Sequence, residues 1–467
     1  MSGARNGEPA YTRGLKPRHI KLISLGGVIG VGLFLGSGRA IAKNGPGLLA
    51  AYAVAGCAIY FIMRALGELI MYRPVSGAFA THANEFVGRW AGFVTGWSYW
   101  FVWVTMGMAE ITAIALFVRY WYPDVPQWLP ALITLTVLYA TNRLTVRTFG
   151  EFEFWFAIIK IVTILALIGI GIAALFFGVG PLAQQARLTN LWADGGFFPL
   201  DMLGFAVTLQ LVVFAFQGIE IIGVTSGEAA EPQRTLPRAV NSVIWRILFF
   251  YIGSLAIIMA LIPWTEFAPD QSPFVEVFAR SGIPSATTIV YLVIISSAAS
   301  SCNSGLFSTG RMLHALAQNG QAPAAFGRLS AKHVPAAAIT FSAAIMLIGV
   351  LLNYLVPGRV FVWITSISTI GGIWTWGMIM WTHLRWRQAV AEGRVQGVAF
   401  RMPGAPYVNW AVLAFLGLVS IFLALDDDTR VALYVLPFWA LALWLGYNAA
   451  SAAPPVEEPD APAPSTS

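Results

Sequence analysis

Residues 25–38 read LGGVIGVGLFLGSG, and this stretch decides the fold. It places six glycines within the thirteen residues 26–38 of an otherwise apolar run. Each glycine costs about 1 kcal/mol of helix propensity relative to alanine, so a helix through this run should be interrupted. Unwound backbone at membrane depth is tolerated only where it lines a cavity in the protein. The stretch therefore predicts a broken membrane helix beside a binding site.

The composition of the chain indicates a membrane protein. Of its 467 residues, 57% are hydrophobic and 11% are charged, which is less than half of the roughly 25% charge of soluble proteins. A soluble core stops growing near about 250 to 300 residues, so the excess apolar surface must face lipid. The net charge of +6 is spread singly between apolar runs, which suits membrane topology better than nucleic-acid binding.

No motif points to an enzyme, a cofactor or a metal. Cys57 and Cys302 lie in separate apolar runs, so they predict neither a disulfide framework nor a zinc site. Arg311, His314 and His333 are scattered in a way that matches neither a metal cluster nor a catalytic triad. A Walker loop is absent from the sequence, so we expect no nucleotide and no hydrolysis.

About 20 apolar residues are needed for each bilayer crossing, and this length predicts twelve spans. They lie near residues 20–41, 48–71, 91–120, 128–144, 152–177, 200–225, 240–263, 286–317, 336–356, 361–384, 408–425 and 431–447. We expect an all-α integral membrane protein.

The distribution of basic residues predicts the orientation. With the N-terminus inside, 19 of the 28 lysines and arginines fall on the cytoplasmic side and 7 outside, while Arg64 and Lys160 lie within spans. This asymmetry favours both termini in the cytoplasm. Residues 74–90 fit an interfacial helix on that side. The proline-rich, acidic residues 451–467 predict a disordered tail.

A second interruption is predicted in residues 214–220, which read FAFQGIE and place an amide, a glycine and a carboxylate in mid-span. It lies five spans after the first. Paired interruptions are expected of an inverted repeat with a midplane site between its halves. The domains would then be a cytoplasmic segment 1–19, a first five-helix repeat 20–179, a second repeat 200–385, two further helices over 406–447 and the tail 451–467.

At the first break, the free backbone N–H groups of Gly30, Val31 and Gly32 would form a cradle for a carboxylate. The alternative is that these small residues only permit close helix packing.

Ionisable residues inside the apolar runs should each have a partner or a task. Arg64 and Glu68 are four apart on one helical face, which predicts an ion pair or gate, and a direct role in transport is the alternative. Lys160 lies deep enough to lose its proton, and snorkelling to the headgroups is the alternative. Glu110 would contact the substrate or its proton, or be a neutral hydrogen-bonded acid, and Glu220 would hold the second break or sense an amine.

Polar and aromatic side chains of other spans complete the candidate site. Ser300 and Ser304 share a helical face and could bond Lys160 or the first break, although ordinary interhelical hydrogen bonding is the alternative. The predicted pocket wall comprises Trp103, Phe216, Gln217, Gly218, Ser366, Thr369, Trp374 and Trp376.

Several runs resemble bacterial amino-acid permeases of the amino acid–polyamine–organocation superfamily, in its amino acid transporter family. They are GGVIGVGLF (26–34), MRALGE (63–68), FGEFEFWFAIIK (149–160) and GIE (218–220). Residues 297–309 and 427–430 are most similar to the D-serine/D-alanine/glycine branch, while 219–223 are equally similar to proline or aromatic permeases. The resemblance covers nearly the whole chain.

The resemblance implies a LeuT-like fold with broken helices 1 and 6, in the bacterial inner membrane. It implies proton symport of a neutral α-amino acid, small by resemblance (glycine, alanine or serine, of either hand), with Lys160 in the place that sodium fills in sodium-coupled relatives. Val31 stands where similar permeases have Thr or Ser, so a hydroxyl is missing from the cradle. Proline, aromatic or 4-aminobutyrate transport, proton-independent exchange and a non-transporting sensor remain open alternatives.

Overall fold

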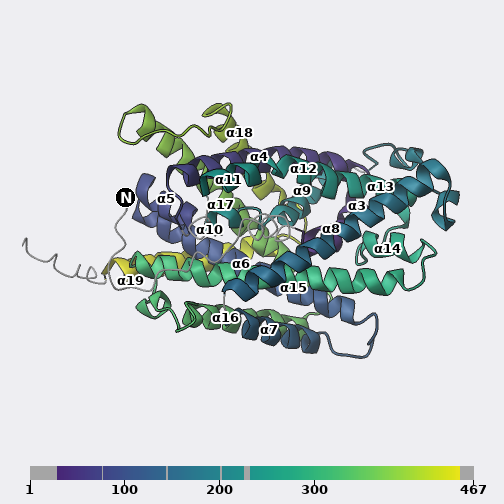
Figure 1. The fold of residues 1–467 in the computed structure, drawn as a ribbon, viewed down its shortest axis with the longest axis horizontal. Coiled ribbons are helices and arrows are strands. Elements are labelled where there is room, and N and C mark those ends of the chain that lie inside the picture. The colour runs from purple at the N-terminus through teal and green to yellow at the C-terminus, as the bar shows by residue number, and fades with distance from the viewer. Residues whose placement is uncertain (1–28, 76, 144–145, 200–201, 226–231, 453–467) are drawn as a thin grey trace, which may run out of the picture.

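The computed structural model is a bundle of long helices that run broadly along one axis of the molecule (Figure 1). It describes residues 29–75, 77–143, 146–199, 202–225 and 232–452, and this part of the chain contains no strand. The helices of the first half are α2 (Val31–Phe34), α3 (Gly36–Asn44), α4 (Gly47–Tyr72), α5 (Ala78–Phe86), α6 (Arg89–Val118), α7 (Trp128–Asn142) and α8 (Val146–Phe177).

The second half is also helical, with a π-helical stretch at Ile247–Gly253 between α12 and α13. Its helices are α9 (Met202–Phe216), α10 (Ile221–Thr225), α11 (Pro232–Asn241), α12 (Val243–Arg246), α13 (Ser254–Leu261), α14 (Pro273–Ala279), α15 (Ala286–Gln318), α16 (Ala336–Leu355), α17 (Val360–Ala391), α18 (Tyr407–Phe422) and α19 (Val431–Ala452).

Nine helical segments within the described residues are long and apolar enough to cross a membrane, so the prediction of an all-α membrane protein is confirmed at that level. Two further predicted spans are the shorter apolar helices α7 and α18. The described part of the first span consists of α2 and α3, and its residues 20–28 lie outside the described residues. The count of twelve and the inverted repeat stay predictions.

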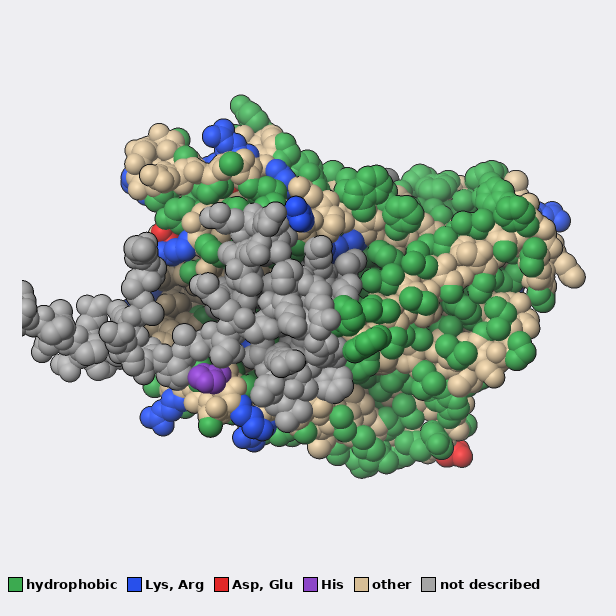
Figure 2. Space-filling model, viewed as in Figure 1, with side chains coloured by type: hydrophobic (Ala, Val, Ile, Leu, Met, Phe, Trp, Pro, Cys, Tyr) green, Lys and Arg blue, Asp and Glu red, His purple; other side chains and the backbone are tan. Residues whose placement is uncertain are grey.

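The surface has the character of a protein that sits in lipid. Hydrophobic side chains are spread over much of the right-hand part of the face in Figure 2, and the lysines and arginines visible there gather mainly at the opposite end. The outer side of α19 exposes Tyr434, Phe438 and Trp444, whose exposed fractions are 64%, 75% and 62%. Cys57 on α4 is exposed as well, whereas Cys302 is buried. A soluble protein would not leave so many large apolar side chains uncovered.

Helices α6 and α15 pack against each other in the centre of the bundle. A glycine makes their close approach possible: a Cβ on Gly305 would lie 2.8 Å from the ring of Trp103. Small residues at helix interfaces are the usual means of packing membrane helices closely. This contact fixes the two helices that carry most of the candidate site.

The predicted ion pair between Arg64 and Glu68 is wrong. The Glu68 carboxylate instead accepts a hydrogen bond from Met402 N at 2.7 Å, contacts His383 Nε2 at 2.9 Å and pairs with Arg387 Nε at 3.0 Å. The guanidinium of Arg64 donates to Asn241 Oδ1 and lies over the Phe400 ring. The spacing placed both side chains on one helix face, but each of them contacts its own partners on other segments of the chain.

The segment predicted as an interfacial helix contains α5. Its residues Ala78, Phe79, His82 and Ala83 are buried, and the helix packs against α6 and α17. This helix therefore buries its apolar side against protein. The predicted tail lies outside the described residues from 453 onward, and Ser451 and Ala452 complete α19.

Two ion pairs join α3 to the connection between α18 and α19. Lys43 Nζ lies 2.9 Å from Asp426 Oδ1, and Arg39 pairs with Asp428. Both pairs are partly exposed. They connect the helix that follows the first glycine-rich stretch to a loop near the end of the chain.

Candidate functional site

The glycine-rich run begins a helix in the middle of the protein. The backbone of Gly30 is extended (φ −120°, ψ −159°), and α2 starts at the next residue without a side-chain cap. The Gly30 carbonyl accepts hydrogen bonds from the N–H groups of Leu33 and Phe34. After one turn the helix is offset at Leu35 and continues as α3. Thus residues 30–32 lie at a helix start, where sequence reasoning placed a carboxylate cradle.

The predicted interruption of the sixth run is present. Helix α9 ends at Phe216, α10 begins at Ile221, and Gly218 between them has φ = +95°. The carboxylate of Glu220 accepts hydrogen bonds from Gly218 N at 3.3 Å and from Trp376 Nε1 at 3.1 Å. Glu220 therefore holds the unwound segment against α17, which is the first of the two roles expected for it.

The helix start at Val31 and the interruption after Phe216 lie close together. A Cβ on Gly32 would be 2.6 Å from the Cα of Ala215 in α9, which means that the two backbones are nearly in contact. Only glycine permits this approach at position 32. The start of α2 therefore lies directly against the end of α9 inside the bundle.

Glu110 from α6 reaches this region. A Cβ on Gly30 would lie 2.6 Å from Glu110 Oε1 and 3.3 Å from Ser301 Oγ, so both polar side chains lie against the Gly30 backbone. The Glu110 carboxylate thus lies beside the Ser301 hydroxyl at the backbone of Gly30. It is fully buried, and neither oxygen completes a hydrogen bond of normal geometry within the described residues.

Lys160 on α8 also reaches α15. Its side chain is fully buried, so it does not snorkel to the surface, and Nζ donates to Ser300 Oγ at 3.1 Å. The predicted contact between Lys160 and α15 is therefore present. Sequence reasoning did not place Ser297 in the site, although its hydroxyl donates to the Ile29 carbonyl at 2.7 Å. The spacing of Ser297 and Ser300, three apart on one helix, was the available signal.

Several buried polar atoms on α6 and α15 lack a well-formed hydrogen bond within the described residues. They are Tyr99 Oη, Trp103 Nε1 and both Glu110 oxygens on α6, and Ser301, Ser304 and Ser308 Oγ on α15. On each helix these positions recur at helical spacing, so they share a face. Buried polar groups normally have partners, and groups left open mark a place for water, an ion or a ligand.

Other predicted wall residues have structural contacts. The side-chain amide of Gln217 makes two hydrogen bonds with Ser368. Gln217 Nε2 donates to the Ser368 carbonyl, and the Ser368 hydroxyl donates to Gln217 Oε1, each at 2.8 Å. Phe216 is fully buried against Tyr52 and Tyr251. These two residues brace the second break.

Of the candidate wall residues on α17, three are held by hydrogen bonds and one is exposed. Trp376 binds Glu220, Thr369 accepts from Gln210 Nε2, and Ser366 donates to the Val362 carbonyl. Trp374 is 41% exposed, so its placement in the pocket wall is wrong. Trp374 and Trp376 are two positions apart on α17, so they point in different directions, and the sequence does not say which one faces inward.

Comparison with known proteins decides the family. A family model described as "Amino acid permease" matches residues 19–457. The chain belongs to the amino acid permease family. Among its relatives are the uncharacterized amino acid permease YtnA of Bacillus subtilis (48% identical, 93% of this chain and 94% of the relative) and the probable threonine/serine transporter YbxG of the same species (45%, 91% and 91%). A D-serine/D-alanine/glycine transporter of Escherichia coli is 43% identical over 94% of both chains.

The family resemblance seen in the sequence is thus confirmed. This permease is a multi-pass membrane protein of a transporter family, and neither its family nor its relatives indicate a catalytic activity.

Proposed function

We propose that this permease imports a small neutral α-amino acid together with a proton. The substrate carboxylate would bind the backbone N–H groups of Gly30, Val31 and Gly32. The ammonium group would bind carbonyl oxygens of the two breaks. Unwound helix segments in a membrane protein interior supply these dipoles without any charged side chain.

One observation carries the proposal: the carboxylate of Glu110 lies against Gly30, within the cradle itself. Two carboxylates at one buried site repel each other, so one of them must be neutral. A bound substrate carboxylate would therefore require Glu110 to be protonated. Substrate and proton would bind together, which is the requirement for symport.

Lys160 supplies the second half of the coupling. Its Nζ donates to Ser300 Oγ, and the next residue on the same helix, Ser301, lies with Glu110 against Gly30. With Glu110 ionised, the pair is neutral overall, and with Glu110 protonated, Lys160 remains a fixed positive charge that favours the substrate anion. The same charge disfavours a sodium ion nearby.

A small substrate is favoured by the packing around the site. Trp103 and Gly305 are in contact, and Trp103 is almost fully buried, so α6 and α15 leave little room between them. Two relatives are named for small substrates, one for D-serine, D-alanine and glycine and one for threonine and serine. We therefore place the substrate of this permease among small neutral amino acids, in a bacterial inner membrane with both termini in the cytoplasm.

The test is accumulation of labelled glycine, alanine and serine in proteoliposomes under an imposed pH gradient, with and without sodium. Unlabelled proline, phenylalanine and 4-aminobutyrate serve as competitors. We expect proton-driven, sodium-independent uptake that the small amino acids inhibit best. Uptake that does not depend on the pH gradient would contradict proton symport. Stronger inhibition by proline or phenylalanine would contradict the proposed preference for small amino acids.

The variant Glu110→Gln separates binding from coupling. A neutral amide mimics the protonated acid, so counterflow should persist while accumulation driven by the pH gradient falls at least tenfold. Lys160→Ala should likewise abolish accumulation. Full accumulation by either variant would show that the coupling is assigned to the wrong groups. Arg385→Gln is the control, because Arg385 is exposed and its side chain binds only Gln388 within the described residues.

A further inference from the structure

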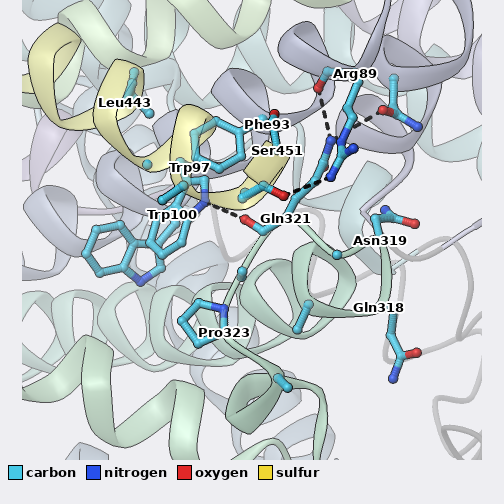
Figure 3. Close-up of a pocket in the computed structure, with 18 of the residues that line it drawn as sticks. Arg89, Phe93, Trp97, Trp100, Gln318, Asn319, Gln321, Pro323, Leu443 and Ser451 are labelled. Atoms are coloured by element: carbon cyan, nitrogen blue, oxygen red, sulfur yellow. Dashed lines mark hydrogen bonds between the residues drawn. The ribbon is translucent and has the colours of Figure 1, made fainter. Parts of the chain in front are cut away.

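A large cleft lies away from the site described above, between α6, the end of α15, α16 and the last helix, α19 (Figure 3). Its volume is about 1270 Å³. Arg89 and Ser451 lie at one end, and Trp97, Trp100 and Trp439 line the other. We call this space the interfacial cleft. None of the substrate or proton residues proposed above lines it.

The apolar part of the interfacial cleft is built from aromatic rings whose polar atoms are already bound. Trp97 Nε1 donates to the Gln321 carbonyl at 3.0 Å, and Trp100 Nε1 donates to Ser342 Oγ at 2.9 Å. Trp100 and Trp439 stack in the same cluster. Because their N–H groups are satisfied internally, these rings present apolar surface to the cleft.

The polar end is built around Arg89, the first residue of α6. Its guanidinium donates from Nη2 to the Ala450 carbonyl at 3.1 Å, which is its one hydrogen bond within the described residues. A guanidinium has five N–H donors, so Arg89 retains donors for an anion. The described residues that line the cleft include no Asp or Glu. The start of α6 adds the positive end of a helix dipole at the same place.

The dimensions of the interfacial cleft match one leaflet of a bilayer. Trp100 lies eleven positions after Arg89 on α6, which corresponds to about 16 Å along the helix axis. Half of the hydrocarbon core of a bilayer is about 15 Å thick. The cleft is therefore polar at the depth of the headgroups and apolar to about the midplane, on the side that the distribution of basic residues assigns to the cytoplasm.

We propose that the interfacial cleft holds one anionic phospholipid, with its phosphate at Arg89 and an acyl chain along Trp97, Trp100 and Trp439. The polar-to-apolar gradient fits a lipid, and the unopposed positive charge selects an anionic one. The lipid would fill the gap between α19 and the central helices and tie them together.

The test is native mass spectrometry of the detergent-purified protein, titrated with palmitoyl-oleoyl phosphatidylglycerol or with the phosphatidylcholine of the same chains. We expect one tightly bound phosphatidylglycerol and weaker binding of phosphatidylcholine. Glycerol 3-phosphate, which has no acyl chain, should not displace the lipid. Equal binding of the two lipids, or displacement by glycerol 3-phosphate, would overturn the proposal.

Two variants locate the bound lipid. Arg89→Gln should weaken phosphatidylglycerol binding about fivefold, and Ala442→Trp, which fills the apolar part of the cleft, should remove the bound lipid. The control Arg385→Gln removes an exposed arginine outside the cleft and should leave phosphatidylglycerol binding unchanged. Unchanged binding in Arg89→Gln would refute the site. A second outcome would also refute it. If a chain truncated after residue 452 bound the lipid and the full chain did not, residues 453–467 would be the occupant of the cleft.

Discussion

At the scale of single residues, Gly30 is the position where backbone and side-chain chemistry meet. Its missing Cβ leaves room for the Glu110 carboxylate and the Ser301 hydroxyl against the main chain. Sequence reasoning selected Gly30 and Glu110 separately, one for its lack of a side chain and one for its charge inside a span. Both were predicted to contact the substrate, and the structure adds that they contact each other directly.

Gly30→Ala should therefore impair transport with little effect on folding. The new methyl group would lie 2.6 Å from Glu110 Oε1, so the carboxylate must move away from the cradle. We expect uptake in proteoliposomes to fall at least tenfold. The control is Gly36→Ala, where the nearest atom to the added Cβ, the Val31 carbonyl oxygen, is 3.9 Å away. Equal uptake by the two variants would contradict the assigned contact.

Glu68 gives a second test at this scale, because its partners differ from those that spacing predicted. Glu68→Gln should lower the free energy of unfolding by about 1 to 3 kcal/mol, since the partner Arg387 is only partly buried and removal of one member leaves the other unpaired. Thermal unfolding in detergent measures this.

A double-mutant cycle distinguishes the two possible partners. Glu68→Gln and Arg387→Gln should be coupled, whereas Glu68→Gln and Arg64→Gln should be additive. Coupling between Glu68 and Arg64 of comparable size would restore the pairing that spacing suggested.

At the scale of elements, the interruption between α9 and α10 depends on one left-handed residue. Gly218 has φ = +95°, and Glu220 and Gln217 bind the segment to α17. An alanine in a left-handed conformation costs about 1 to 2 kcal/mol. The segment is thus held in a conformation that other residues would resist.

Gly218→Ala should destabilise the protein by about that amount and reduce uptake, as measured by thermal unfolding and transport in parallel. Gly417→Ala in α18 is the matched control, since an added Cβ there meets no atom within 4 Å. If Gly218→Ala is as stable and active as Gly417→Ala, the strained turn has no role.

The element scale also shows how far the sequence predicts this fold. Apolar length predicted the long helices closely, because each crossing needs a fixed number of apolar residues. The FAFQGIE run predicted the second interruption, because it places an amide, a glycine and a carboxylate in the middle of an apolar span. Which side chains face the interior was harder to predict, as Trp374 and Arg64 show, because partners from distant helices decide it.

At the scale of the whole molecule, two ion pairs connect the first helices to the last connection of the bundle. Lys43 binds Asp426 and Arg39 binds Asp428, across nearly 400 positions of sequence. Helix α3 follows directly from the candidate cradle. A change in the position of α3 during transport would therefore stretch both pairs.

Reversing one pair tests this connection. Lys43→Asp or Asp426→Lys alone should slow uptake two- to fivefold, since the pair is partly exposed and each such contact contributes about 1 kcal/mol or less. The double variant should recover the wild-type rate. Failure of the double variant to recover would mean that the two charges act separately.

The two thiols of the chain differ in a way that favours site-directed labelling. Cys302 is buried, and Cys57 lies exposed on α4, a helix apolar enough to lie within the membrane. Water-soluble thiol reagents react poorly with a cysteine surrounded by lipid chains. A single cysteine introduced beside the cradle or on α3 should therefore dominate such a reaction, so that water access from each side of the membrane can be followed in an otherwise unaltered chain.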